Sequence, residues 1–169
     1  MVLSYKYKLE PTNDQKLLLN NHFFIFNQAW NITLSSHIKS RDEGLPYLDN
    51  TELDRMIKPI LKDRNLSFNT KIVQRAIALA NQAIQTNYKN QKNRKSKDSK
   101  AKFSDISYRV SSEPKQVIET TKEQYSIVDN GKLGVLRLFR EDFKYIKHRE
   151  IPNDHEVKNV KISKNGNEY

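Results

Sequence analysis

Cysteine is absent from the sequence, and several signals that identify common protein classes are absent with it. Without cysteine the chain can form no disulfide, no thiolate zinc site and no cysteine nucleophile. Glycine occurs only four times, and no glycine-rich phosphate loop is built from these residues. No apolar run reaches the length of a membrane span, and no signal-peptide pattern follows Met1. Together these absences predict a cytoplasmic protein with no membrane partner.

Catalytic and metal-binding patterns are missing as well. The acidic clusters of the C-terminal half are better explained as solvated turns than as a set of catalytic carboxylates. The histidines lack the spacing of a metal-binding helix; they are His22, His37, His148 and His155. We therefore predict no catalytic residue, no metal site and no cofactor in this chain.

What the chain does have is an excess of positive charge. It contains 30 Lys and Arg against 20 Asp and Glu, for a net charge of +10. Residues 86–169 hold most of this excess, with 19 basic and 12 acidic side chains against 11 and 8 in residues 1–85. Such a balance favours polyanionic partners, of which nucleic acid is the first candidate.

One stretch near the N-terminus organises the rest of the chain. Tyr5 and Tyr7 alternate with lysines, which is the period of a half-buried strand, and Pro11 ends this strand. Thr12 and Gln15 have the spacing of a capping box, which predicts that a helix begins here. Apolar side chains then recur at helical spacing and predict a buried helix face rather than a stacking surface for bases. They are Leu19, Phe23, Phe26, Trp30 and Leu34.

Two further helices follow in the sequence. Thr51 is the predicted N-cap of the second helix, and we expect Pro59 to kink or end it. Asn69 or Thr70 caps the third helix, whose alanine-rich side allows close approach of another helix. We predict a compact bundle in which the first and third helices form the main pair.

The third helix runs into a strongly basic segment, residues 89–102. Seven of its fourteen residues are Lys or Arg, and only Asp98 opposes them. The segment has no large apolar residue and cannot build a core of its own. We predict a linker that becomes ordered only on a polyanion.

The last third of the chain changes to the period of β-strands. Asp129-Asn130-Gly131 is a strong hairpin signal, and a second Asn-Gly turn occurs at Asn165-Gly166. Only three residues follow that second turn, so we infer that the chain stops inside a fold unit before a return strand. The predicted strands are residues 125–128, 132–139, 144–147 and 157–163.

Two patterns together resemble one known family. The first runs Tyr7-Lys8-Leu9-Glu10-Pro11-Thr12 and continues with Gln15, Leu18, Leu19 and Phe26-Asn27-Gln28-Ala29-Trp30-Asn31. The second runs from Leu133–Leu138 through His148–Pro152 to Val157–Ser163. Both are similar to TnpB, also called OrfB, an accessory protein of bacterial insertion sequences whose first segment is described as a transposase helix-turn-helix domain.

The resemblance implies an α+β chain, in which an antiparallel wedge-type β-barrel is interrupted by a helical recognition bundle and truncated before a RuvC-like nuclease. It places the first wedge strand at residues 1–10, the recognition lobe at 11–100 and the remaining, C-terminally incomplete wedge strands at 101–169. The family is an RNA-guided DNA endonuclease. Its catalytic carboxylates with their divalent metals, and its zinc site, are expected only in the missing C-terminal part, so this chain is not expected to be an enzyme.

The resemblance also implies the partners, which are guide RNA and double-stranded DNA. Tyr47, Gln74 and Thr121 match the positions that read a short DNA motif beside the target, and glutamine can pair with adenine. The residues assigned to phosphates of the RNA are Lys6, Lys8, Lys89, Lys92, Arg94, Lys95, Lys97, Arg137, Arg140, Lys147 and Arg149.

Two other interpretations remain open. The chain could be a truncated or decayed transposase-associated fragment with no activity of its own, which the unfinished hairpin favours. It could also be a helix-turn-helix DNA-binding regulator, although the aromatic-rich first helix fits a recognition helix poorly.

Overall fold

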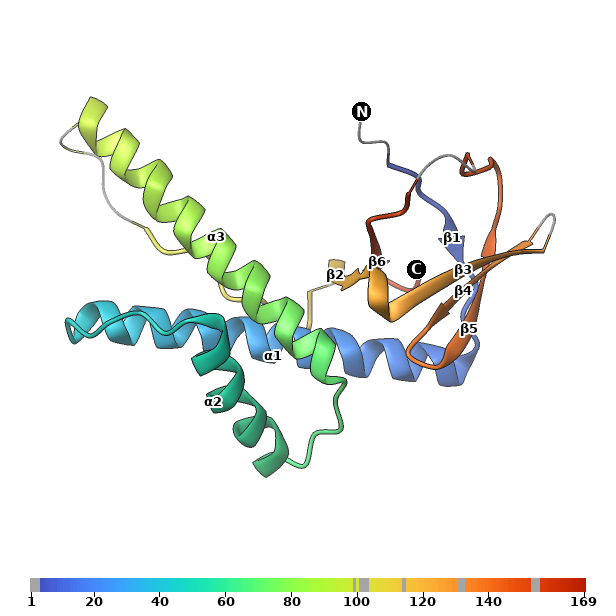
Figure 1. Ribbon diagram of the computed structural model, residues 1–169, viewed down its shortest axis with the longest axis horizontal. Helices are drawn as coiled ribbons and strands as arrows, with labels where there is room; N and C mark the ends of the chain where they lie inside the picture. Colours follow the sequence, from blue (N-terminus) through green and yellow to red (C-terminus); the bar gives the residue numbers. More distant parts are fainter. Residues whose placement is uncertain (1–3, 99, 101–103, 114, 131–132, 153–155) are drawn as a thin grey trace. The chain divides into compact units, whose positions relative to one another are not determined.

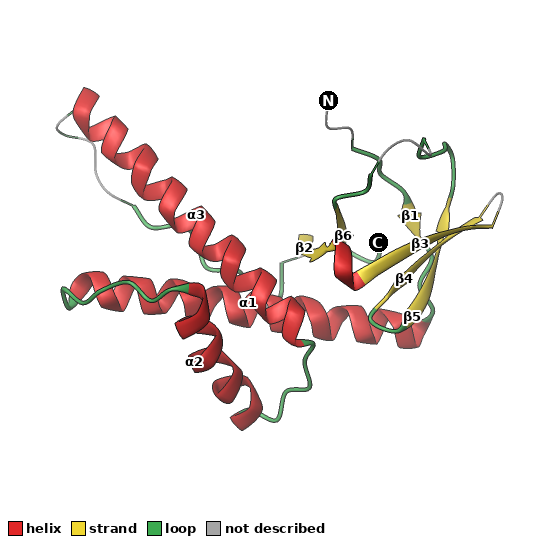
Figure 2. Cartoon of the chain, in the orientation of Figure 1, coloured by secondary structure: helices red, strands yellow, loops and turns green. Residues whose placement is uncertain are grey.

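The computed structural model describes residues 4–98, 100, 104–113, 115–130, 133–152 and 156–169 (Figure 1). Helices and antiparallel sheets are both present, which confirms the predicted α+β class (Figure 2). The chain divides into a helical unit, residues 24–111, and a β unit, residues 1–23 with 112–169. The β unit is therefore interrupted in sequence by the helical unit.

The helices begin at the caps that the sequence encodes, with one exception. The predicted capping box at the first helix is confirmed: the Thr12 amide donates to Gln15 Oε1 at 3.1 Å, and the Gln15 amide donates to Thr12 Oγ1 at 3.3 Å. Asn69 caps the third helix by accepting a hydrogen bond from the Lys71 amide at 2.9 Å. The helices are α1 (Asn13–Asp42), α2 (Asn50–Asp63) and α3 (Thr70–Lys97).

The second helix corrects one prediction, that of its N-cap. Its N-cap is Asp49 rather than Thr51, because Asp49 Oδ1 accepts from the amides of Thr51 and Glu52 at 2.7 and 2.8 Å. Glu52 accepts a bond from the Asp49 amide in return and completes the capping box. Pro59 does not end α2, which continues to Asp63.

The third helix corrects the prediction of a basic linker. Residues 89–97 are helical, so the irregular segment predicted at 89–102 is wrong over most of its length. The physical reason is that these residues include no glycine or proline and extend a helix that is already nucleated. Residues 99 and 101–103 lie outside the described part of the chain.

The core of the helical unit is aliphatic. Leu53, Ile57 and Leu61 of α2 recur every fourth residue and are fully buried. They belong to the same core as Phe26 of α1 and Ile77 of α3, which are also buried. Burying an aliphatic side chain of this size stabilises a fold by about 1.5–3 kcal/mol. The stripe predicted on α1 is buried as expected, apart from Trp30, which is partly exposed.

An extended segment, residues 104–110, is tied to the helices of the same unit, and we call it the strap. Asn31 of α1 binds Arg109 twice, through an amide-to-carbonyl bond of 2.8 Å and an accepted backbone bond of 2.7 Å. The Arg109 guanidinium lies over the Trp30 ring, 4.2 Å from its centroid. Asp105 forms a salt bridge of 2.6 Å with Arg41. No pattern in the sequence indicated this segment.

The β unit contains two antiparallel sheets. One has the strand order β1-β5-β4-β3, and the other pairs β2 with β6. The described strands do not close into a barrel, because β1 contributes only two paired residues and β2 pairs with β6 in a separate sheet. The predicted wedge-type barrel is therefore found only as open antiparallel sheets. The strands are β1 (Lys8–Leu9), β2 (Lys115–Thr121), β3 (Tyr125–Asn130), β4 (Leu133–Leu138), β5 (Glu141–Ile146) and β6 (Asn159–Asn165).

The two hairpins of the larger sheet have different origins. β3 and β4 pair as the Asp129-Asn130-Gly131 signal predicts, whereas β4 and β5 are joined by Phe139 and Arg140. Both of these residues have positive φ, of 57° and 68°, as a type I′ turn requires. Phe139 stacks on His22 with ring centroids 3.9 Å apart, and this contact offsets the strain of a turn without glycine.

Close packing across the larger sheet depends on a glycine. Gly134 of β4 faces Tyr145 of β5, and a Cβ atom at Gly134 would lie only 1.9 Å from the Tyr145 ring. At the other sheet, the Asn165-Gly166 turn is present, and Asn165 bridges to Glu168. The Leu9 amide donates to the Tyr169 carbonyl at 2.9 Å. The residues after this turn therefore pair, contrary to the expectation that none was left to do so.

Candidate nucleic-acid interface

The densest positive charge of the helical unit lies on the last turns of α3 (Figure 1). We call residues 89–97 the basic end of α3. Its cations are exposed, and none of them has an ion pair within the described part of the chain. Unpaired cations keep their full charge for phosphates, and each contact with a phosphate releases condensed counterions. These cations are Lys89, Lys92, Arg94, Lys95 and Lys97.

One side of the basic end is anchored to the strap. Gln91 is 7% exposed, and its Oε1 accepts a hydrogen bond from the Ser104 amide at 2.9 Å. Its amide nitrogen donates to the Ser104 carbonyl, as does that of Asn87 at 2.9 Å. With successive residues turned by about 100°, Lys89, Lys92 and Lys97 lie on the sides of the helix away from Gln91, whereas Arg94 and Lys95 lie within about 60° of it. Cations near a helix C-terminus also stabilise the helix itself, which is the structural explanation for part of this charge.

The predicted phosphate-binding residues of the β unit differ, because several are neutralised by acids. Arg137 makes a bidentate pair with Asp142 at 2.7 and 2.9 Å. These hydrogen bonds raise the pKa of Arg137 and lower the pKa of Asp142. Lys8 lies 3.7 Å from Glu168 and Lys147 lies 3.2 Å from Glu150. Lys6 and Arg140 are both exposed, and no ion pair of either is among those of the described residues.

Arg149 belongs to an aromatic cluster of the β unit that the sequence did not indicate. Its guanidinium lies 4.7 Å from the centroid of Tyr5 and donates to the Ser4 carbonyl at 3.3 Å. Tyr7 donates its hydroxyl to the Arg149 carbonyl at 3.0 Å and contacts the rings of Tyr145 and His148. The lysine–tyrosine alternation of the N-terminal strand therefore supports a cluster of rings and cations as well as a strand.

Two of the predicted motif-reading residues are engaged within the protein. The Gln74 amide donates to Asp54 Oδ2 at 3.2 Å, and Lys58 binds the same oxygen at 2.5 Å. Thr121 precedes the short 3-10 helix η1 (Lys122–Gln124), and its backbone amide donates to Gln124 Oε1 at 3.0 Å. Gln74 is exposed and can exchange its partner, whereas Thr121 has a structural role at the end of β2. Gln74 lies in the helical unit and Thr121 in the β unit.

The third predicted residue, Tyr47, lines a pocket of the helical unit. The pocket has a volume of about 330 Å³. The Tyr47 hydroxyl donates to the Tyr88 hydroxyl at 3.2 Å, and the two rings stack with centroids 5.8 Å apart. Burial, and then this hydrogen bond, raise the pKa of Tyr88 to about 12. The lining residues are His37, Tyr47, Leu48, Asp49, Asn50, Asn81, Ile84, Gln85 and Tyr88.

A chain of polar groups extends behind Tyr47. His37 Nε2 lies 2.5 Å from Asn81 Oδ1, and the Asn81 amide donates to Asn50 Oδ1 at 2.5 Å. His37 Nδ1 is buried and has no hydrogen-bond partner within the described residues. His37 was not predicted as a site residue, because it lacks ligand spacing. A histidine and an asparagine among the apolar positions of two packed helices are the signal that could have indicated this network.

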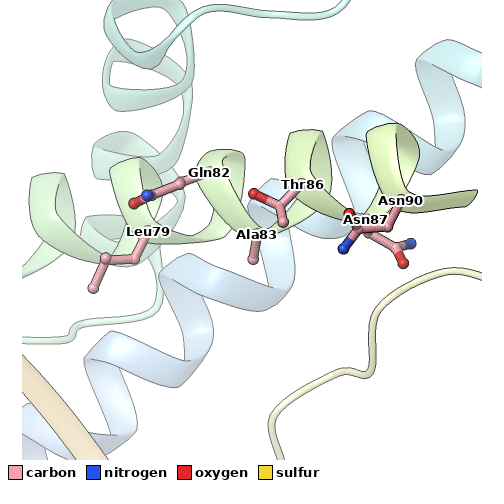
Figure 3. A pocket seen from close by; sticks show the side chains of 6 residues that line it. All are labelled: Leu79, Gln82, Ala83, Thr86, Asn87 and Asn90. Carbon is pink, nitrogen blue, oxygen red and sulfur yellow. The ribbon is translucent and has the colours of Figure 1, made fainter. Parts of the chain in front are cut away.

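A second, shallower depression of about 440 Å³ follows one face of α3 (Figure 3). Its side chains are spaced three and four residues apart, so they form one stripe along the helix. The stripe is uncharged and ends where the basic end of α3 begins. It is formed by Leu79, Gln82, Ala83, Thr86, Asn87 and Asn90.

Two other kinds of feature are not found in the described part of the chain. Within the described residues, no three histidine, aspartate or glutamate side chains gather in a way that could hold a metal ion. None of the described helices combines the length and the apolar character needed to cross a membrane.

Comparison with known proteins identifies one segment of the chain. Residues 1–45 match the helix-turn-helix domain of the OrfB proteins of IS605 elements. No curated protein matches the chain. In the described part of the matched segment there is a single helix, α1, and the next helix starts at Asn50. Helix-turn-helix domains are a DNA-binding class, so the match suggests that the chain binds DNA. Residues 1–45 of the chain therefore resemble the N-terminal region of the transposase-related OrfB proteins of IS605 elements.

Proposed function

We propose that the chain is a nucleic-acid-binding part of a TnpB-like RNA-guided DNA endonuclease. In this role it holds a guide RNA and reads a short DNA motif beside the target, and it does not itself cut DNA. The observation that carries the proposal is the basic end of α3, with five exposed cations and no ion pair within the described residues. The OrfB match at residues 1–45 supports the same conclusion independently.

The basic end supplies affinity rather than sequence preference. Phosphate contacts position a nucleic acid on a protein, whereas contacts with base edges distinguish one sequence from another. A helix surrounded by cations on most sides can follow a phosphate backbone without a fixed register. We therefore assign the basic end to the guide RNA, and we expect the paired cations of the β unit, such as Arg137 and Lys147, to contribute less.

Base reading is assigned to Gln74 of the helical unit. Gln74 is exposed, and its amide can leave Asp54 for the edge of an adenine. The exchange leaves no charge unpaired, because Asp54 keeps its salt bridge to Lys58. We expect Gln74→Ala to retain RNA binding and to weaken any sequence preference on duplex DNA.

The proposal is tested by removing the same amount of charge from two different places. In one variant Lys92, Arg94, Lys95 and Lys97 are replaced by Gln, and in the control Lys39, Lys62, Lys115 and Lys158 are replaced by Gln. Both remove four exposed cations. Binding to a structured RNA is measured by fluorescence anisotropy across a series of salt concentrations. We expect the first variant to bind more weakly and to flatten the slope of log K against log salt by about 0.7–0.9 for each lost contact.

The two variants separate a local surface from a general charge effect. Equal losses in both would show that net charge alone attracts RNA, and parent-like binding by the first variant at every salt concentration would refute the proposal. Thermal unfolding serves as the control for folding, and we expect a change within about 0.5 kcal/mol because these side chains are exposed. Metal-dependent DNA cleavage that is lost on replacing one of the chain's own carboxylates would contradict the expected lack of nuclease activity.

A further inference from the structure

The pocket at Tyr47 has the chemistry of a nucleobase site. We infer that it binds a single unstacked base that carries an exocyclic amine, such as adenine. This inference rests on the proposed function only in taking the base to be part of a nucleic acid. It differs from the reading of a paired base by Gln74, because the base must leave its helix to enter the pocket.

Size and charge favour a base over a phosphate. The volume of about 330 Å³ lies at the lower end of the range of roughly 300–1,000 Å³ that is typical of small-molecule sites. No lysine or arginine is among the lining residues, and the one carboxylate among them belongs to Asp49. An anionic group would be repelled by that carboxylate, whereas a neutral aromatic ring would not be.

Tyr47 provides a stacking surface that is already fixed in place. Tyr47 is 47% exposed, so part of the residue is accessible to a ligand. The ring is held by its hydroxyl bond to Tyr88 and by its contact with His37, at 4.9 Å between centroids. A ring that is held before binding loses little conformational freedom when a base stacks on it.

The hydrogen-bonding groups of the pocket match an amine beside a ring nitrogen. Asp49 caps α2 through Oδ1, which leaves Oδ2 able to accept a hydrogen bond from an amine. Asn50 accepts from Asn81 through Oδ1, which leaves its amide able to donate to a ring nitrogen. Gln85 is exposed and adds a second amide that can pair with an adenine edge.

His37 fixes the polar network behind the pocket. The Asn81 amide donates to Asn50, so Asn81 Oδ1 must accept from His37 Nε2. These bonds determine which groups of Asn50 are left for a ligand. Thymine and uracil have no exocyclic amine to donate to Asp49, so the pocket should discriminate against them.

The test uses the full chain and three end-labelled DNA duplexes. One contains a single unpaired adenine, the second an unpaired thymine, and the third is fully paired. We expect the adenine bulge to bind about tenfold more tightly than either of the others, the change that stacking of one base produces. Tyr47→Ala should abolish this preference, and Gln85→Ala should reduce it. Gln82→Ala is the matched control, because Gln82 is an exposed glutamine of α3 that lines the other depression.

Free nucleosides distinguish the source of the base. Adenosine and thymidine are titrated into the chain while the imidazole signals of His37 are followed by NMR. Shifts caused by adenosine and lost in Tyr47→Ala would support the site. If the duplexes bind with strong salt dependence but show no preference for the bulge, and adenosine leaves His37 unchanged, the inference is overturned while the proposed function stands. If adenosine binds and no duplex does, the nucleic-acid source and the proposed function both fail.

Discussion

The two units of the chain use charge and packing in opposite ways. The helical unit has an aliphatic core and a cluster of cations at the end of α3 that no acid neutralises within the described residues. The β unit buries the rings of Phe143 and Tyr145 beside aliphatic side chains such as Leu138, and it pairs Arg137, Lys8 and Lys147 with acids. Positive charge of the same kind therefore gives different surfaces. The β unit also has exposed cations outside these pairs, such as Lys6 and Arg140, but in the helical unit five of them are gathered on the last turns of one helix.

The contrast matters for the set of residues predicted from sequence to hold RNA. The net charge counts every lysine and arginine equally. A cation in an ion pair, however, is already partly neutralised by its acidic partner and attracts a phosphate less strongly. The pair between Arg137 and Asp142 joins residues directly opposite each other on β4 and β5. It is a cross-strand pair of the kind that stabilises a sheet. The cations of the basic end have no such partner within the described residues, and this difference moves the expected binding surface toward the helical unit.

The largest expected effect is a loss of stability on removing a core side chain of the helical unit. Ile57→Ala removes a fully buried side chain from α2 and leaves a cavity between packed helices. We expect it to lower the free energy of unfolding by about 3–4 kcal/mol. Urea denaturation followed by far-UV circular dichroism measures the change. If the units unfold separately, the amide protons of β3 to β5, followed by NMR over the same urea series, should keep their parent midpoint, and a midpoint that falls together with that of the helices would show that the units unfold as one.

The next largest effect is a loss of stability on overpacking the larger sheet of the β unit. Gly134→Ala places a methyl group 1.9 Å from Tyr145, closer than any real contact, so the ring or the strand must move. We expect a loss of about 2–3 kcal/mol, in the range of overpacked cores. The near-UV circular dichroism of the folded variant should also differ from that of the parent, because Tyr145 packs against Tyr7 in the same cluster. The double variant Gly134→Ala with Tyr145→Leu removes the clashing ring and serves as the control, and it should recover part of the loss.

These differences between the units also explain what could be predicted from the sequence. The caps at Thr12 and Asn69 were predicted because each depends on residues two or three positions away. Asp49 was missed because two capping patterns overlap within a few residues, and local rules do not decide between them. The pairing of β3 with β4 was predicted from the Asp129-Asn130-Gly131 signal, whereas the turn at Phe139 is stabilised by His22, more than a hundred residues earlier.

The candidate site shows the same limit. Lysines and arginines can be counted in a sequence, so a basic segment was predicted at residues 89–102, although its helical form was not. The pocket at Tyr47 was not found, since its polar network joins His37 to Asn81 across 44 positions. The strap was missed for the same reason, because the bonds of Asn31 to Arg109 span 78 positions. Features made by contacts between distant residues leave no periodic pattern in the sequence.

The smallest expected effect is a loss of stability at low pH that comes from His22 of the β unit. His22 is 6% exposed, and burial lowers its pKa below the ordinary value of 6.5, although its bond to the Leu18 carbonyl opposes the shift. The unfolded chain therefore takes up a proton at His22 before the folded chain does, so the folded state loses stability as the pH falls below about 6.5. We expect a small loss of stability by the pH at which the folded ring is protonated, with the β unit affected first because His22 stacks on Phe139. His22→Gln should remove this part of the pH dependence. The control is His148→Gln, which changes an exposed histidine of the same unit that contacts Tyr7 rather than Phe139 and should leave the contribution of His22 in place. A parent-like profile in His22→Gln would show that the loss at low pH comes from the carboxylates and not from this ring.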